Sequence, residues 1–135
     1  MKTANLIKVG AIALAMGLGL SPALAGGSSV SIEQYGYGNG AGGSQKGKRN
    51  KLTIYQNGRG NAVISDQRGV RNLSVFGQQG KRNSAQAYQD GRGNIVGIAQ
   101  FGTGHTAVAT QDGNGNAVGI IQAGRNNSAK TRQVG

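Results

Sequence analysis

The chain has no cysteine, no tryptophan and few aromatic residues, and only four of its 135 residues are acidic. Without cysteine, no disulfide can reinforce a small exported domain. With two phenylalanines, four tyrosines and 26 glycines, a conventional globular core is hard to build. Three of the acidic residues, Asp66, Asp90 and Asp112, stand apart in the sequence, with no nucleophile and base beside them. We therefore expect a protein that is not an enzyme, carries no metal or cofactor, and is held together by repeated hydrogen bonds.

Long apolar runs are confined to the N-terminus. The N-terminus carries positive charge at Lys2 and Lys8. An apolar run follows over residues 9–20, which is shorter than a typical bilayer-spanning helix. The small residues at 23–25 are typical of a cleavage site, so residues 1–25 are predicted to be a secretory signal peptide. The alternative is a membrane anchor, although nothing later in the chain is apolar enough to span. Residues 26–135 would then form the secreted chain.

Positive charge dominates, with 15 lysines and arginines against the four acidic residues. Removing Lys2 and Lys8 leaves 13 − 4 = +9 on the secreted chain. Such a balance favours anionic partners such as extracellular DNA or acidic polysaccharide, although like charge also keeps an aggregation-prone chain soluble. The candidate anion-binding residues cluster in predicted turns: Lys46, Lys48, Arg49, Arg68, Arg71, Lys81 and Arg82.

The most regular feature of the sequence is a glutamine at every eleventh position from Gln34 to Gln133, without interruption. The glutamines of this series are Gln34, Gln45, Gln56, Gln67, Gln78, Gln89, Gln100, Gln111, Gln122 and Gln133. A glycine follows each by two positions: Gly36, Gly47, Gly58, Gly69, Gly80, Gly91, Gly102, Gly113, Gly124 and Gly135. Five positions after each of the first nine glutamines stands an asparagine, except once: Asn39, Asn50, Asn61, Asn72, Asn83, Asn94, Asn116 and Asn127, with His105 as the exception.

Each unit is predicted to be a strand followed by a tight turn. In Asn50-Lys51-Leu52-Thr53-Ile54-Tyr55-Gln56, apolar and polar residues alternate with period two, as in a strand with one buried face. Glycine and asparagine after the glutamine favour a turn that needs positive φ. Strands with bulky inward residues alternate with strands whose inward residues are mostly small, so the structural period is 22 residues. Alternating volumes allow two sheets to interdigitate.

The expected fold is all-β: a β-solenoid of five strand–turn–strand–turn rungs in two stacked parallel sheets. The rungs are predicted at residues 28–49, 50–71, 72–93, 94–115 and 116–135. At about 4.8 Å per rung, the body would be roughly 24 Å tall. Inward glutamines and asparagines would form amide ladders up the stack. His105 takes the place of a ladder asparagine, and protonation of a buried histidine there would weaken assembly at mildly acid pH.

Both ends of this stack are predicted to be open sheet edges, which recruit further strands. The first strand begins at Ser28 and the last ends at Gln133, and no capping segment is recognisable. The chain is therefore expected to polymerise into a cross-β fibre. The predicted polymer ends are Ser28, Val30, Ile32, Gln34, Asn127, Ala129, Thr131 and Gln133. The alternative from another class is a monomeric β-solenoid that binds anionic polymers.

The repeat resembles that of the curlin subunits of curli, the extracellular functional amyloid of Gram-negative biofilms. The curlin pattern Ser-x5-Gln-x-Gly-x2-Asn-x-Ala-x3-Gln is matched in full by Ser28, Gln34, Gly36, Asn39, Ala41 and Gln45. Later rungs begin with Asn50, Asn72, Asn94 and Asn116 in place of the serine, and Val63 replaces the alanine in the second rung. The resemblance covers residues 28–135.

The resemblance implies a secreted subunit that leaves through an outer-membrane pore with accessory factors and polymerises at the cell surface. Such fibres serve biofilm matrix, adhesion and surface colonisation. A minor curlin nucleates and anchors the fibre formed by the major one. The intact last rung favours the major type, whereas the strong positive charge is more like the minor type. Members of the family usually carry a flexible pore-addressing segment before the first repeat, and here only Gly26 and Gly27 stand there.

Overall fold

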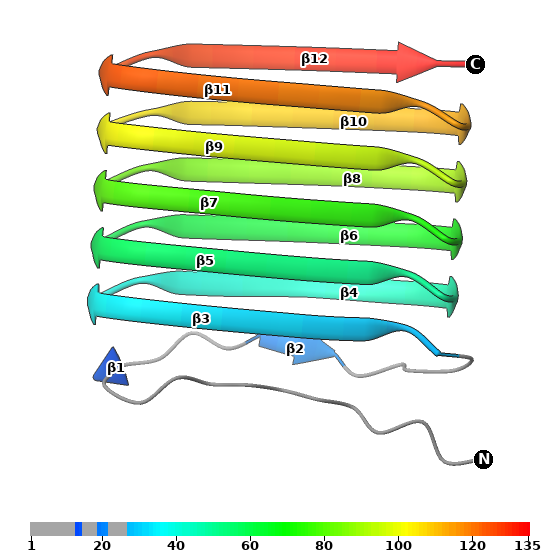
Figure 1. Cartoon of the computed structure of the whole chain (residues 1–135), viewed down its shortest axis with the longest axis horizontal. Helices are drawn as coiled ribbons and strands as arrows, with labels where there is room; N and C mark the ends of the chain where they lie inside the picture. Colours follow the sequence, from blue (N-terminus) through cyan, green and yellow to red (C-terminus); the bar gives the residue numbers. More distant parts are fainter. Residues whose placement is uncertain (1–12, 15–18, 22–26) are drawn as a thin grey trace.

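The computed structural model describes residues 13–14, 19–21 and 27–135 (Figure 1). Two short strands, β1 (Ala13–Leu14) and β2 (Gly19–Ser21), precede ten long ones. The long strands are β3 (Ser29–Tyr37), β4 (Gly40–Lys48), β5 (Lys51–Arg59), β6 (Ala62–Val70), β7 (Leu73–Lys81), β8 (Ser84–Arg92), β9 (Ile95–Thr103), β10 (Thr106–Asn114), β11 (Ala117–Arg125) and β12 (Ser128–Val134).

The long strands form two parallel sheets that face each other. Sheet A has the order β1-β3-β5-β7-β9-β11, and sheet B has the order β12-β10-β8-β6-β4-β2. Each strand from β3 to β10 pairs with the strand 22 residues later without a bulge, so Gln56 lies beside Gln34 and Gln78 beside Gln56. Two consecutive strands therefore make one rung, and five rungs stack into the body seen in Figure 1. The predicted all-β solenoid with two parallel sheets is confirmed.

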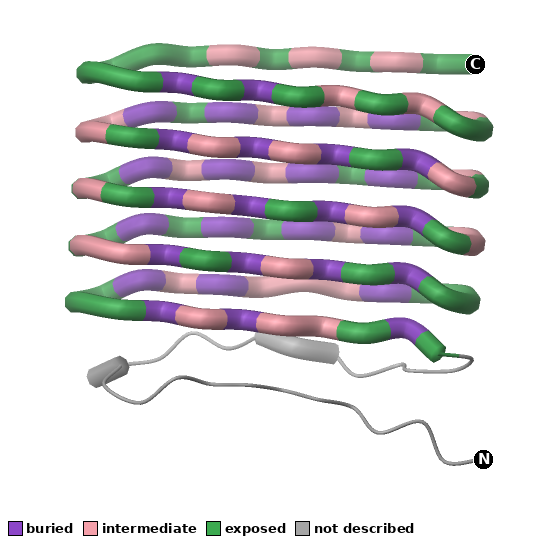
Figure 2. Tube along the Cα trace, viewed as in Figure 1, coloured by how far each residue is buried: buried purple, intermediate pink, exposed green. Residues whose placement is uncertain are grey.

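The core is a thin apolar layer between the sheets, and burial alternates along every central strand (Figure 2). Sheet A contributes bulky side chains such as Ile54, Phe76 and Ile98, and sheet B contributes small ones such as Ala85 and Ala107. All of these are at most 2% exposed. The close approach of the sheets explains why volumes must alternate across the core.

The strands are longer than the sequence pattern predicts. The glycines two positions after the ladder glutamines, from Gly36 to Gly124, do have positive φ, but they lie within the strands rather than in the turns. At Gly58, for example, φ is 131° and a Cβ atom would collide with the carbonyl oxygen of Gly80 one rung on. These glycines therefore allow successive rungs to stack closely where the strand bends.

The tight turns lie two residues further on, directly before each ladder asparagine. The residue at this corner has φ between 54° and 80°, as at Gly60 and Gly93. Four corners carry a side chain in this left-handed conformation, namely Arg49, Arg71, Arg82 and Asn126. Backbone hydrogen bonds such as Gly60 N to Tyr37 O, at 2.8 Å, link each corner to the rung before it. The turns therefore stack in register with the strands.

The N-terminal edge of the stack has short partners in the full chain. β1 pairs with β3 through two residues and β2 pairs with β4 through three. Both belong to the segment predicted as a signal peptide, whose residues 1–12, 15–18 and 22–25 lie outside the described residues. The edge expected to be open at Ser28 is thus partly paired while this segment is attached. Within the described residues, no helix is long and apolar enough to cross a membrane.

Candidate assembly interface and basic edges

Glutamine ladders run up both sides of the core. In sheet A they link Gln34, Gln56, Gln78, Gln100 and Gln122, each Nε2 donating to the next Oε1 over 2.5–2.9 Å. In sheet B they link Gln45, Gln67, Gln89, Gln111 and Gln133 over 2.7–3.0 Å. The interior glutamines are at most 2% exposed. Buried amides of this kind stabilise the stack only when their hydrogen bonds are complete.

The glutamine ladders have a direction. From Gln45 to Gln122, each Nε2 also donates to a backbone carbonyl on the opposite sheet 16 residues earlier, as from Gln56 to Gly40 O and from Gln78 to Ala62 O, both at 3.0 Å. Reversing the amide would place an oxygen against two acceptors, so the hydrogen-bond network itself assigns the orientation. In every rung the glutamine donor points toward the C-terminal end of the stack.

The asparagine columns work differently from the amide-to-amide ladder that was predicted. The Oδ1 atom of Asn50 accepts from the backbone N–H of Asn72 at 3.0 Å, while its Nδ2 donates to the carbonyls of Lys46 and Gly69. The same pattern recurs at Asn61 and at Asn72. Asparagine lies at a turn, where the free N–H of the next asparagine is within reach of its short side chain. These columns therefore connect side chain to backbone and close the turns.

His105 occupies an asparagine position and reproduces most of this pattern. Its backbone N–H donates to Asn83 Oδ1 at 3.1 Å, and its Nδ1 accepts from the backbone N–H of Asn127 at 3.2 Å. Its Nε2 lies 3.0 Å from the carbonyl oxygen of Phe101, so this nitrogen carries the proton. The neutral imidazole satisfies both contacts, and the residue is fully buried.

The two ends of the stack present opposite halves of these hydrogen bonds. At the C-terminal end, β11 and β12 each have a partner strand on one side only. There, Gln122 Nε2 reaches only the carbonyl of Thr106, and Gln133 Nε2 has no partner among the described residues. At the N-terminal end, the Oε1 atom of Gln45 is buried and has no partner in that part of the chain. Glutamine donors are thus available at the C-terminal end of the stack, and a glutamine acceptor is available at the N-terminal end.

The predicted polymer-end residues lie on these terminal rungs. Ser28, Ile32 and Gln34 are buried against the second rung, and Val30 is half-buried. On the last strand, Ala129, Thr131 and Gln133 are half-buried, and Asn127, directly before it, is exposed.

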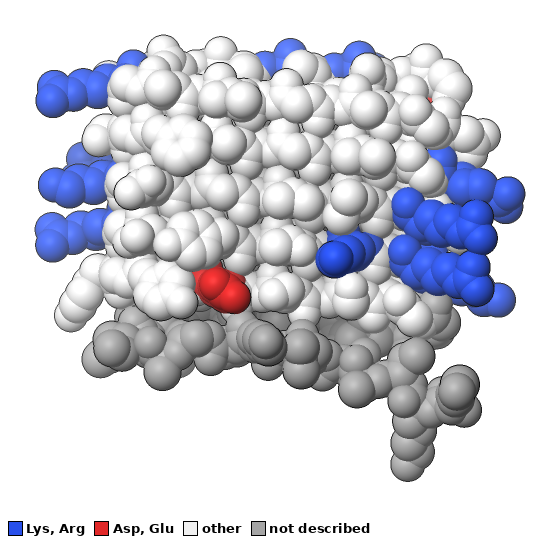
Figure 3. Space-filling model, viewed as in Figure 1, with Lys and Arg blue, Asp and Glu red and all other residues white. Residues whose placement is uncertain are grey.

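Most of the basic residues lie along two edges of the solenoid, where the strands end (Figure 3). The first basic edge, at the ends of the sheet A strands, consists of Arg59, Lys81, Arg82 and Arg125. The second basic edge, at the ends of the sheet B strands, consists of Lys46, Lys48, Arg49, Arg68, Arg71 and Arg92. The seven predicted anion-binding residues are therefore not one cluster. The prediction also omitted Arg59, Arg92 and Arg125, which the 22-residue period places in the same rows.

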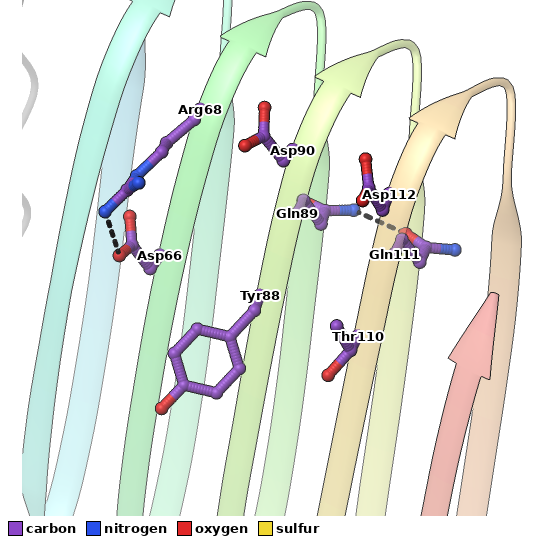
Figure 4. A pocket seen from close by; sticks show the side chains of 8 residues that line it. All are labelled: Asp66, Arg68, Tyr88, Gln89, Asp90, Thr110, Gln111 and Asp112. Atoms are coloured by element: carbon purple, nitrogen blue, oxygen red, sulfur yellow. Dashed lines mark hydrogen bonds and ion pairs between the residues drawn. The ribbon is translucent and has the colours of Figure 1, made fainter. Parts of the chain in front are cut away.

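Three acidic residues that stand far apart in the sequence meet on the outer face of sheet B. Asp66, Asp90 and Asp112 line a shallow hollow with Tyr88 and Arg68 (Figure 4). Asp90 and Asp112 are register partners, and Arg68 lies 3.7 Å from Asp66. No group of three or more potential metal ligands occurs among the described residues.

Comparison with known families identifies the repeat. The model of the curlin associated repeat matches residues 27–58 and again residues 80–113. A comparison with curated protein sequences gave no match. Both matched segments begin and end within the stack of rungs, and they include ladder residues of both sheets. The repeat family and the solenoid fold are structural rather than catalytic in character. The chain therefore belongs to the curlin family, whose members are extracellular fibre subunits.

Proposed function

We propose that this chain is a secreted structural subunit that assembles end to end into curli-like functional amyloid fibres. The observation that carries the proposal is the complementarity of the two ends. Glutamine donors at the C-terminal end match glutamine acceptors at the N-terminal end, so one copy continues the ladder of another only head to tail. Two like ends would bring donor against donor or acceptor against acceptor.

The 22-residue register extends across such a junction without adjustment. Placing β3 of the next copy on β11 brings its Gln34 over Gln122 and its Ile32 over Ile120. Placing its β4 on β12 brings its Gln45 over Gln133. The buried Oε1 of Gln45 would then accept from Gln133 Nε2, and the free backbone groups of both edge strands would pair. Strands perpendicular to the fibre axis give a cross-β structure.

The fibre would serve biofilm matrix, adhesion and surface colonisation at the surface of a Gram-negative bacterium. Its proposed partners are an outer-membrane secretion pore, accessory factors and a second curlin, as the resemblance to curlins implies. The last rung supports the role of major rather than nucleating subunit, because it keeps both ladders. Gln122 accepts from Gln100 at 2.8 Å, and Gln133 accepts from Gln111 at 3.0 Å.

A seeding experiment with residues 26–135 tests the proposal. The ten long strands, the core and the ladders all lie within residues 28–135, so this segment contains the whole folded body. Amyloid-dye fluorescence and electron microscopy should show growth after a lag, and preformed fibres should abolish the lag. Rapid growth without seeds, together with seeding of a second curlin, would assign the nucleating role instead. Persistent monomer at high concentration would exclude a fibre subunit and favour the monomeric solenoid.

We further propose that the two basic edges retain extracellular DNA or acidic polysaccharide along the fibre. Arg49, Arg71 and Arg82 support this because they occupy left-handed corners at which other rungs carry glycine. A side chain in this conformation costs about 1 kcal/mol or more relative to glycine, so these arginines are not explained by the fold. Strain of this kind is common at functional positions. Fibres that retain no DNA even at low salt would contradict this part of the proposal.

A further inference from the structure

The two outer faces of the solenoid differ in charge. On sheet B, all five long strands carry outward charged residues, among them Lys46, Asp66, Asp90, Asp112 and Arg132. On sheet A, the outward charges between the basic edges are Glu33 on β3 and Lys51 on β5. The outward residues of β7, β9 and β11 are uncharged between those edges, and Figure 3 shows this face almost free of charge.

We call the outward surface of these three strands the apolar face. Its columns in register are Leu73, Ile95 and Ala117; Val75, Gly97 and Gly119; Gly77, Ala99 and Ile121; and Gln79, Phe101 and Ala123. Several of these side chains are strongly exposed, with 41% for Val75, 47% for Ile95 and Phe101, and 81% for Ile121. Contiguous exposed apolar surface of this kind marks an interaction site.

Three glycines hollow the apolar face without any reason inside the chain. Gly77, Gly97 and Gly119 line an open groove of about 490 Å³ with Val75 and Ile121. A Cβ atom at each of these glycines would meet no atom within 4 Å, and none has the positive φ of the stacking glycines. Glycine weakens a strand, and in a strand it often marks the close approach of another surface. The described residues contain nothing that fills the groove.

We infer that the apolar face is a lateral interface that pairs two fibres of this protein face to face, an inference that rests on the proposed fibre. The occupant is a second copy because the apolar face carries both the projecting side chains of Val75 and Ile121 and a groove lined by glycines that can receive such side chains. A self-complementary patch of this kind can form an isologous contact. Two sheets pack in this way about 10 Å apart.

The size of the face explains why pairing must follow polymerisation. The apolar face spans three strands, or about 14 Å, and seven residues along each strand, or about 23 Å, which gives an area of roughly 320 Å². A stable interface needs about 800 Å² per partner, so single subunits stay unpaired. In a head-to-tail fibre the face recurs on the same side every five rungs, and three successive copies exceed this area. Repulsion between the basic edges weakens pairing at low ionic strength, so salt should promote it.

Variants on the two faces test the inference. Ile121→Lys places charge on the apolar face, and Gly97→Val fills the groove with a residue that favours strands. Ile64→Lys is the matched control because Ile64 is 46% exposed and belongs to sheet B. Each variant of residues 26–135 would be polymerised at moderate salt. Dye fluorescence reports fibre formation, and small-angle scattering with electron microscopy reports the mass per unit length.

Wild-type and Ile64→Lys fibres should show about twice the mass per unit length of Ile121→Lys and Gly97→Val fibres, with all four forming fibres. Unpaired wild-type fibres, or pairing that survives both substitutions on the apolar face, would overturn the inference and leave the fibre itself intact. Loss of pairing in Ile64→Lys would also overturn it. Wild-type fibres that stay single but bind lipid vesicles would assign the face to another occupant. A wild-type chain that forms no fibre would instead end the proposed function.

Discussion

The Nε2 atom of Gln89 donates to Oε1 of Gln111 at 3.0 Å, although the two residues are 22 positions apart (Figure 4). The same nitrogen donates to the carbonyl of Leu73 on the opposite sheet, also at 3.0 Å. Gln89 Oε1 accepts from Gln67 and from the hydroxyl of Ser74. One side chain thus joins three rungs and both sheets, and its orientation follows from these contacts.

Replacing Gln89 with alanine should therefore strongly destabilise the fold. The change leaves several buried polar groups without partners, each at a cost of about 1–3 kcal/mol. The matched control is Gln79→Ala, since Gln79 is exposed on sheet A, and it should change stability by less than about 0.5 kcal/mol. The denaturant concentration at the midpoint of unfolding, or of fibre dissolution, measures both. Equal midpoints for the two variants would contradict the buried-ladder account.

Gln133→Glu should block growth while preserving the subunit. The carboxylate can still accept from Gln111, so the intramolecular bond is kept. It cannot donate, and it would face the Oε1 atom of Gln45 in the next copy, where two acceptors repel. Seeded growth rates should fall by at least about tenfold, equivalent to about 1.4 kcal/mol. Gln86→Glu makes the same charge change on the outer face of sheet B, away from the end, and should grow normally; similar slowing of both would point to a general charge effect.

Gly80→Ala and Gly77→Ala should have opposite consequences within one strand. At Gly80 a Cβ atom would collide with the carbonyl oxygen of Gly102, and φ is 122°. At Gly77 the added methyl group meets no atom within 4 Å. We expect Gly80→Ala to prevent regular stacking of that rung, and Gly77→Ala to be neutral or stabilising by up to about 1 kcal/mol. Circular dichroism and unfolding midpoints separate the two, and a well-folded Gly80→Ala protein would refute the stacking role.

Replacing Arg49, Arg71 and Arg82 together with glycine should separate binding from stability. Glycine is the residue found at equivalent corners, so stability should be unchanged or slightly increased. Affinity of fibres for DNA should fall, and the slope of log K against log salt should decrease by up to about 2.7 in magnitude for three lost phosphate contacts. Filter binding across salt concentrations measures this. Unaltered DNA retention would remove these corners from the proposed binding surface.

The sequence by itself was sufficient for the architecture. Period-two alternation identifies the buried face of each strand, and the alternation of bulky and small inward residues distinguishes sheet A from sheet B. Because like residues recur every 22 positions, stacking the rungs in register gives each rung the same hydrogen bonds and the same packing. The fold, the rungs and the membership of the curlin family follow from this repetition.

Only the tertiary structure decided the features that depend on neighbours outside one strand. The direction of the glutamine ladders comes from carbonyls of the opposite sheet, which no local pattern specifies. The asparagine columns bond to backbone rather than to one another because the next turn brings an N–H within reach. Whether an outward residue joins the apolar face or the charged face depends on which sheet its strand enters. The sequence repeat determines the strands and turns of each rung. Contacts between rungs and between sheets determine how the two ends and the two faces of the solenoid differ.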